Sequence, residues 1–248
     1  MPSKDTNTGA KRAREARQRF GLDDVSPVAC VLTLVEERAQ LPVMVAALPD
    51  GLAGALWRNG VGSIVWVNGG QAVERQRFTV AHELGHVCCG HAGTNVDTHE
   101  TISGRTHDPR EVQANAFAAQ LLAPAAGVRV LVGRDPDLED LVRLAAHFGI
   151  STVAALYRCS TLGLLSKSRH DALQREIDEK LHHRVWDYLD PEPLRDVLAE
   201  TEQPRVPPAL AGSALAALLD GRVSVGAAAS AAGCPADRLG DAAAALAR

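Results

Sequence analysis

The residues with the clearest chemical potential are two histidines and a glutamate in the stretch ERQRFTVAHELGHV, residues 74–87. His82 and His86 are four positions apart, and on a helix this spacing places both imidazoles on one face. Such a pair can bind one metal ion, and Glu83 lies on the flank of the same face, close enough to contact a metal-bound water. The pattern H-E-x-x-H therefore predicts a Zn²⁺ site in which Glu83 is the general base of a hydrolytic reaction.

The residues around this pattern also favour a metal site. Two histidines and a glutamate buried on an apolar helix would be unfavourable without a metal or other polar partners. Gly85 lowers the helix propensity and indicates that another element approaches closely at that point. The alternative is a partly exposed helix with two incidental histidines. The apolar residues that make burial the better interpretation are Phe78, Val80, Ala81, Leu84 and Val87.

A catalytic zinc ion needs a third protein ligand and one open position. The metzincin pattern is excluded, because Cys89 and Ala92 stand where it requires glycine and histidine. His91 lies about 140° around the helix from His86, which is unfavourable for binding the same ion. Asp97 follows Gly93-Thr94 in a weak match to the aspzincin pattern G-T-x-x-D. The candidates for the third ligand are His91, Asp97, Glu100 and Glu111.

Glu111 is the better placed of these candidates. It begins the segment EVQANAFAAQLLAP, residues 111–124, in which Glu111 and Asn115 share one face of a predicted helix. A carboxylate and an amide on an otherwise apolar helix suit a metal ligand and a residue that supports a ligand. A charged residue that complements the dipole in the first helical turn is an almost equally good interpretation. Spacing alone leaves the choice open.

Two of these segments together resemble the ImmA/IrrE family of metallopeptidases. They are ERQRFTVAHELGH and, about twenty-five residues later, E-x-x-A-N-x-F-A-A-x-L-L-x-P. The upstream segment GALWRNGVGSIVWVN, residues 54–68, is similar to the small sheet of that family, and the resemblance covers roughly residues 10–165. It implies a gluzincin-like zinc site with His82, His86 and Glu111 as ligands, Glu83 as the base and Asn115 in a supporting position. The chain departs from the common family pattern at Gln113, where a second acidic residue often stands.

The resemblance also implies a substrate. Members of this family typically cleave a helix-turn-helix repressor and so activate mobile-element or stress genes. We therefore expect a zinc-dependent endopeptidase whose partner is such a repressor. The alternative is a non-catalytic regulator that binds a transcription factor or DNA through the same fold.

Composition limits the other possibilities. Apolar residues make up 46% of the 248 residues and charged residues 23%, which is ordinary for a folded protein, and the net charge of −4 disfavours a protein dominated by nucleic-acid binding. No apolar stretch has the length of a membrane span, and the first twenty residues are polar and basic, so a cytoplasmic location and no membrane partner are expected. The five cysteines form no C-x-x-C pair, and Cys88 and Cys89 are predicted to be core thiols.

The elements that position the motif follow from the hydrophobic pattern. A basic helix is predicted at 9–20, and a second helix at 27–39 begins after Ser26 as its N-cap. Three strands at 41–48, 54–59 and 63–68, separated by turn residues, predict a small antiparallel sheet. A long helix through His91 then carries the metal motif.

The second half of the chain is predicted to be helical. Pro124 ends one of its helices, and Gly149 separates two others in a layout that resembles a helix-turn-helix. An alanine-rich helical tail follows the linker at 203–208. The predicted helical segments are 109–122, 138–160, 163–186 and 192–201.

This order of elements predicts an α+β fold. We expect a zincin-like catalytic domain at 1–135, a helix-turn-helix-like extension at 136–202, and a linker with a small helical tail at 203–248. DNA binding by the extension is disfavoured, because Arg158 is the only charged residue of its second helix, 151–161. An oxyanion donor is also needed, and the sequence does not rank the candidates His91, His99, His107 and Tyr157.

Overall fold

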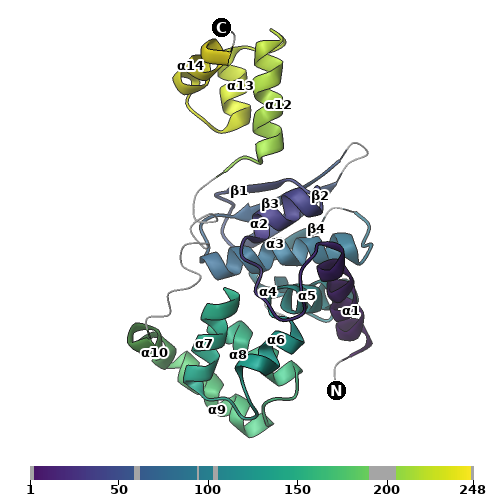
Figure 1. Ribbon diagram of the computed structural model, residues 1–248, viewed down its shortest axis with the longest axis vertical. Coiled ribbons are helices and arrows are strands. Elements are labelled where there is room, and N and C mark those ends of the chain that lie inside the picture. Colours follow the sequence, from purple (N-terminus) through teal and green to yellow (C-terminus); the bar gives the residue numbers. More distant parts are fainter. Residues whose placement is uncertain (1–2, 59–61, 94, 103–105, 190–204, 247–248) are drawn as a thin grey trace.

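The computed structural model describes residues 3–58, 62–93, 95–102, 106–189 and 205–246. A small sheet with helices α1 to α5 occupies the middle of the molecule, helices α6 to α10 lie below it, and helices α12 to α14 lie above it (Figure 1). The α+β class with a helical C-terminal part is confirmed. In the described part of the chain no single helix has both the length and the apolar composition of a membrane span. Helices α5 and α6 meet these two criteria only when they are taken together, and the chain bends by 50° between them.

The sheet contains four strands in the order β1-β3-β2-β4. Strand β2 is antiparallel to both of its neighbours, but β1 runs parallel to β3, so the prediction of a purely antiparallel sheet is wrong. The reason is that β3 inserts between β1 and β2 rather than beside β2 alone. The edge strand β4 was not predicted, because four residues give too short a pattern. The strands are Val43–Ala46 (β1), Leu52–Arg58 (β2), Ser63–Asn68 (β3) and Asn95–Thr98 (β4).

Helices α3 (Val73–Cys88) and α5 (Pro109–Leu122) pack against each other and carry most of the candidate site. The predicted close approach at Gly85 is confirmed, because a Cβ atom there would lie 3.1 Å from the backbone of Ala114 and 3.1 Å from Cβ of Phe117. Helix α1 (Lys4–Arg19) approaches α5 still more closely, since a Cβ on Gly9 would collide with the carbonyl of Gln113. These glycines allow the three helices to form a compact support for the site.

Helix α3 ends at Cys88 and not at His91 as predicted. Gly90 adopts φ +74°, and the amide of His91 donates to the carbonyl of His86 over 3.0 Å. This is the hydrogen-bond pattern of a glycine-terminated helix, in which the chain turns back across the last helical turn. His91 is therefore folded toward His86, which a helical continuation would not permit.

The helix predicted at 27–39 is shorter than expected. It consists of α2 (Val31–Thr33) and a wider π-helical turn at Leu34–Arg38, with Cys30 as the N-cap. Ser26 is not the N-cap, because its amide and hydroxyl both donate to the carboxylate of Asp23, each over 2.6 Å. A local turn closed by Asp23 thus competes with the helix start.

The helical half agrees with its prediction only in part, because the single helix predicted at 163–186 is divided into two at Lys180 (φ +63°), and the short helix α6 was not predicted. The turn between α7 and α8 contains Gly149 at φ +61°, and Asp137 and Asp140 form a capping box at the start of α7. The helix predicted at 192–201 lies outside the described residues. The remaining helices are α4 (His99–Ile102), α6 (Ala125–Leu131), α7 (Leu138–Phe148), α8 (Thr152–Thr161), α9 (Lys167–Asp178), α10 (Leu181–Leu189), α12 (Pro208–Leu219), α13 (Val225–Ala232) and α14 (Ala236–Leu246).

One hydrophobic core joins the metal-motif helix to the helices that follow it. Leu84 of α3, Phe148 of α7 and Leu156 of α8 belong to the same buried cluster. Arg77 of α3 is 1% exposed and donates to the carbonyls of Val28 at 2.7 Å and Gly149 at 3.1 Å. These charge-assisted hydrogen bonds satisfy carbonyls that would otherwise be buried without a partner, and they fix α3 against the turn between α7 and α8.

Candidate metal centre

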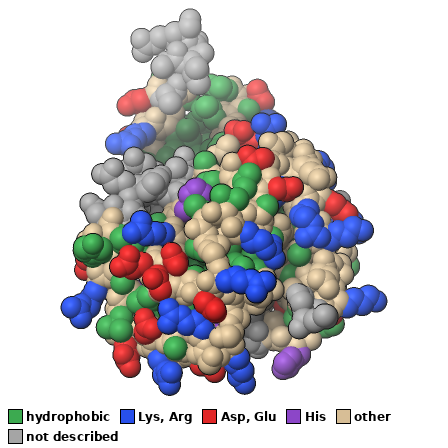
Figure 2. Space-filling model, turned by 60° about the horizontal axis from the view of Figure 1, so that its bottom comes forward, with side chains coloured by type: hydrophobic (Ala, Val, Ile, Leu, Met, Phe, Trp, Pro, Cys, Tyr) green, Lys and Arg blue, Asp and Glu red, His purple; other side chains and the backbone are tan. Residues whose placement is uncertain are grey.

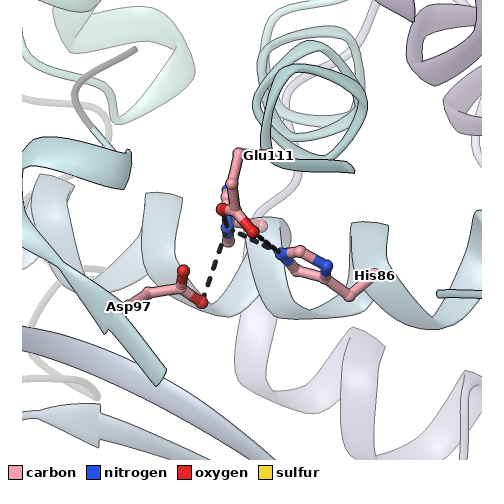
Figure 3. A group of neighbouring side chains, drawn as sticks. His86, Asp97 and Glu111 are labelled. Atoms are coloured by element: carbon pink, nitrogen blue, oxygen red, sulfur yellow. Dashed lines mark hydrogen bonds and ion pairs between the residues drawn. The ribbon is translucent and has the colours of Figure 1, made fainter. Parts of the chain in front are cut away.

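Four buried side chains converge between α3, α5 and β4. His82 and His86 come from α3, Glu111 from the first turn of α5 and Asp97 from β4, and one potential ligand atom of each lies within 4.8 Å of the others. Figure 3 shows His86, Asp97 and Glu111 pointing toward one another from a helix, a strand and a second helix. The structure thus brings together the three residues that the family resemblance implies as ligands, and adds Asp97.

The spacing of these atoms suits a small tetrahedral site. Nε2 of His82 lies 3.0 Å from Nε2 of His86 and 3.2 Å from Oε2 of Glu111. Oε1 of Glu111 is 3.5 Å from Nε2 of His86, and Oδ2 of Asp97 is 3.6 Å from Nε2 of His82. Ligands at 2.0–2.1 Å from a tetrahedral zinc ion would be separated from one another by about 3.3–3.4 Å. The four side chains are therefore already close to a metal-binding arrangement.

The charges of the group also fit a cation. His82 and His86 are fully buried, and Asp97 and Glu111 are 2% and 8% exposed. Among the described residues, Oδ2 of Asp97 and both carboxylate oxygens of the fully buried Glu83 accept no hydrogen bond. Buried carboxylates without donors are unfavourable, and a divalent cation between them would compensate this cost.

The pKa values follow from this crowding of acidic groups. Burial, followed by the nearby carboxylate of Asp97, raises the pKa of Glu83 well above its usual range. Burial alone would lower the pKa of His82, but its contacts with Asp97 and Glu111 outweigh burial and raise that pKa. Burial opposes ionisation of Glu111, yet its close contacts with His82 and His86 outweigh burial and lower its pKa below the usual value. The group as a whole thus favours a positive charge at its centre.

Asn115 orients the first histidine. Its Oδ1 lies 2.9 Å from Nδ1 of His82, and its Nδ2 donates to the carbonyl of Thr101 over 2.8 Å. Because an amide oxygen can only accept, Nδ1 of His82 must carry the hydrogen. The lone pair of Nε2 then faces the site, which is the tautomer that a metal ligand requires. Asn115 therefore lies where it can hold the imidazole of His82 in this orientation.

A longer chain of hydrogen bonds orients the second histidine. Nδ1 of His86 lies 2.9 Å from Nδ1 of His91, and Nε2 of His91 lies 3.3 Å from Oε1 of Gln113. Gln113 in turn donates through Nε2 to Oδ1 of Asp5 in α1 over 2.8 Å. Since Oε1 of Gln113 accepts from Nε2 of His91, Nδ1 of His91 is free to accept from Nδ1 of His86. This leaves Nε2 of His86 available to a metal.

His91 thus contacts the ligand candidate His86 and is not itself one of the four converging residues. The sequence missed this position because the turn at Gly90 replaces the expected helical continuation. We expect His91→Ala to weaken zinc binding about 10- to 100-fold, the usual effect of losing a residue that orients a ligand. Competition with a chromophoric zinc chelator measures this change. His107→Ala is the matched control, because His107 is exposed, and equal affinity in the two variants would contradict the role of His91.

The remaining candidates for an oxyanion donor or a third ligand either lie away from the metal ligands or have side chains outside the described residues. Tyr157 is 54% exposed on α8, and its ring packs against the ring of His170 with centroids 5.2 Å apart. His107 is exposed before α5. The side chains of His99 and Glu100 lie outside the described residues. The structure therefore does not put Tyr157 or His107 beside the metal ligands as an oxyanion donor.

Comparisons with known proteins agree with this geometry. Residues 41–160, which contain all four converging side chains, match the family model described as the IrrE N-terminal-like domain. The radiation response metalloprotease IrrE of Deinococcus radiodurans is 32% identical over 108 residues, 41% of this chain and 33% of the relative. The protein of the same name from Deinococcus deserti is 35% identical over 97 residues, 38% of this chain and 34% of the relative. The chain thus spans about a third of the length of these curated relatives.

Both relatives are named as metalloproteases, and in this chain the buried group of His82, His86, Asp97 and Glu111 could hold a metal ion. The resemblance stated from the two sequence motifs is confirmed. Residues 41–160 match the IrrE N-terminal-like domain, and this match and the two relatives together support an ImmA/IrrE family metallopeptidase.

Proposed function

We propose that this protein is a zinc-dependent endopeptidase in which His82, His86 and Glu111 bind the metal. The observation that carries the proposal is the convergence of both Nε2 atoms and the Glu111 carboxylate, with separations of 3.0–3.5 Å. Two imidazoles and a carboxylate are the ligand set of many catalytic zinc sites, whereas magnesium and calcium prefer oxygen ligands. A bound zinc ion supplies a water of low pKa and polarises the scissile carbonyl.

Glu83 is the general base of this proposal. It precedes Leu84 on the same helix, and its carboxylate is buried against β2, where a Cβ on Gly54 would lie 3.5 Å from Oε1. The carboxylate therefore lies beside the backbone of β2. In this site Glu83 would accept a proton from the attacking water and transfer it to the nitrogen of the departing amine. Its burial strengthens these interactions, since little water competes for the carboxylate.

The proposed substrate is a helix-turn-helix repressor whose cleavage would activate mobile-element or stress genes. The support is the family resemblance, and the names of the two Deinococcus relatives connect those proteins with the radiation response. Direct DNA binding by α7 and α8 is a weaker hypothesis. Arg158, the charged residue of α8, is 6% exposed and donates to the carbonyl of Ala123 over 2.8 Å, so its guanidinium is not available to phosphates.

The surface around α7 and α8 also disfavours direct DNA binding. Figure 2 views the molecule with α6 to α10 brought forward, and on the described part of this face Lys and Arg side chains are interspersed with Asp and Glu. A DNA-binding face usually has a continuous basic patch. Among the large hydrophobic side chains that α8 exposes are Val153 and Tyr157, 40% and 54% exposed, which suit contact with a protein better than contact with phosphates.

The test is direct cleavage. Purified zinc-loaded protein is incubated with the helix-turn-helix repressors encoded by the same genome, beginning with those whose genes lie next to its own. We expect one repressor to be cut at a defined bond, as found by gel electrophoresis and mass spectrometry of the fragments. Binding of a repressor without cleavage would support the non-catalytic regulator instead.

A further inference from the structure

Asp97 has a position that the three-ligand description does not explain. Its Oδ2 lies 3.6 Å from Nε2 of His82, and the residue is 2% exposed. Oδ1 accepts a hydrogen bond from Oγ1 of Thr101 over 3.3 Å, whereas Oδ2 accepts none from the described residues. One oxygen is thus held by the protein and the other is directed at the metal ligands, which is the usual arrangement of a ligating carboxylate.

We propose that Asp97 is a fourth protein ligand of the metal, so that the site is closed in this conformation and becomes active only when Asp97 withdraws. The inference rests on the proposed function. A zinc ion with four protein ligands has a complete tetrahedral shell, whereas a catalytic zinc ion needs one position for water or substrate. In this arrangement Asp97 occupies the position that the attacking water needs.

The strand that carries Asp97 is suited to move away from the other metal ligands. His82, His86 and Glu111 lie on α3 and α5, which are packed tightly through Gly85. Asp97 lies on β4, a four-residue strand at the edge of the sheet that pairs only with β2 among the described strands, with a register shift at Leu52 and Gly54. Few interactions must break for this strand to move. Asp97 is therefore the ligand that can leave with the least disturbance of the core.

Direct ligation can be tested with Asp97→Cys in the cobalt(II)-substituted protein, kept under a reducing agent that does not bind metal. A thiolate bound to cobalt(II) gives an intense near-ultraviolet charge-transfer band that nitrogen and oxygen ligands lack. We expect this band in Asp97→Cys and not in the wild type, since the wild-type ligand group contains no cysteine. Cobalt bound by Asp97→Cys without the band would overturn the inference.

Zinc affinity distinguishes a ligand from a nearby negative charge. We expect Asp97→Ala to bind zinc at least about tenfold more weakly than the wild type. Asp97→His should restore most of the affinity, because imidazole is a ligand without negative charge. The control is Asp171→Ala, since Asp171 is exposed on α9. If Asp97→His binds zinc as weakly as Asp97→Ala, Asp97 contributes only charge and the inference is wrong.

Closure of the site by Asp97 also predicts a change in the rate of cleavage. At saturating zinc, Asp97→Ala should cleave fluorescently labelled casein at least about tenfold faster than the wild type, because the open state no longer competes with ligation by Asp97. Cleavage that is no faster would overturn the closed state. A wild type that binds no zinc would refute the proposed function and this inference together. Zinc-dependent cleavage without the cobalt–thiolate band would refute the fourth ligand alone.

Discussion

Glu83→Gln is expected to retain zinc and the native fold but to cleave the substrate about 10³-fold more slowly, within the range that a lost general base usually costs. Glutamine has the same shape as glutamate, so the space beside Gly54 stays filled. Its amide cannot accept a proton at neutral pH, and proton transfer from water to the leaving nitrogen is lost. The measurement is kcat on the cleaved repressor, together with the zinc content of each variant.

Stability should not fall in the same variant. In metal-free protein, burial and the Asp97 carboxylate raise the pKa of Glu83, so its folded-state pKa lies above its unfolded-state pKa. A group of this kind stabilises the fold below its unfolded pKa, and this contribution is lost as the pH rises through the folded pKa. At neutral pH the neutral amide of Glu83→Gln is therefore expected to leave the melting temperature of the metal-free protein unchanged or higher.

Glu74→Gln is the matched control, because Glu74 lies in the first turn of α3, away from the ligands, and carries the same substitution. It should keep both zinc and activity. Normal cleavage by Glu83→Gln would show that another group is the base. Asp97 would then be the first residue to examine, since its Oδ2, which accepts no hydrogen bond from the described residues, is also buried beside His82.

The part of the site that could be predicted from the sequence is local. His82, Glu83 and His86 belong to one helix, and their relation follows from 3.6 residues per turn. Glu111 and Asn115 likewise share one helix, and the family resemblance joined the two segments. Helical periodicity therefore predicts which residues share one face of α3 and which share one face of α5. The family resemblance predicted that these two faces form one site.

The part that could not be predicted depends on chain reversals. His91 contacts His86 because Gly90 adopts φ +74°, and glycine at that position gives no signal that distinguishes a helix end from a flexible helix. Asp97 reaches the site on β4, whose four residues are too short for a period-2 pattern and whose pairing with β2 spans about forty residues of sequence. The parallel pairing of β1 with β3 is equally non-local, and turn residues alone favoured an antiparallel sheet.

Removal of the third ligand has the other large expected effect. The wild type should contain about one zinc ion per chain, and Glu111→Ala and His86→Ala should lose it. Glu111 contacts Nε2 of His82 at 3.2 Å and Nε2 of His86 at 3.5 Å, so its loss removes the carboxylate shared by both imidazoles. Elemental analysis of the purified proteins measures the metal content.

The same variants should lose the stabilisation that zinc provides. A ligand present at a thousandfold excess over its Kd stabilises the folded state by about 4 kcal/mol. For a chain of this size, that corresponds to a rise in melting temperature of about 8–16 °C. We expect this rise in wild type when zinc is added after chelation, and no rise in Glu111→Ala or His86→Ala.

Glu139→Ala is the control for this experiment, because Glu139 is an exposed residue paired only with Arg143 among the described residues, at 3.6 Å, and it should respond to zinc as the wild type does. The two ligand variants need not behave identically. If Glu111→Ala keeps one zinc ion that His86→Ala loses, the third ligand is Asp97 or Glu100, and Asp97 is favoured because it is the other carboxylate of the converging group. With Asp97 as the third ligand, zinc would be bound from α3 and β4, and Glu111 would serve to hold His82 and His86 in place. Wild type without zinc or a thermal response to it would remove the basis of the proposed peptidase.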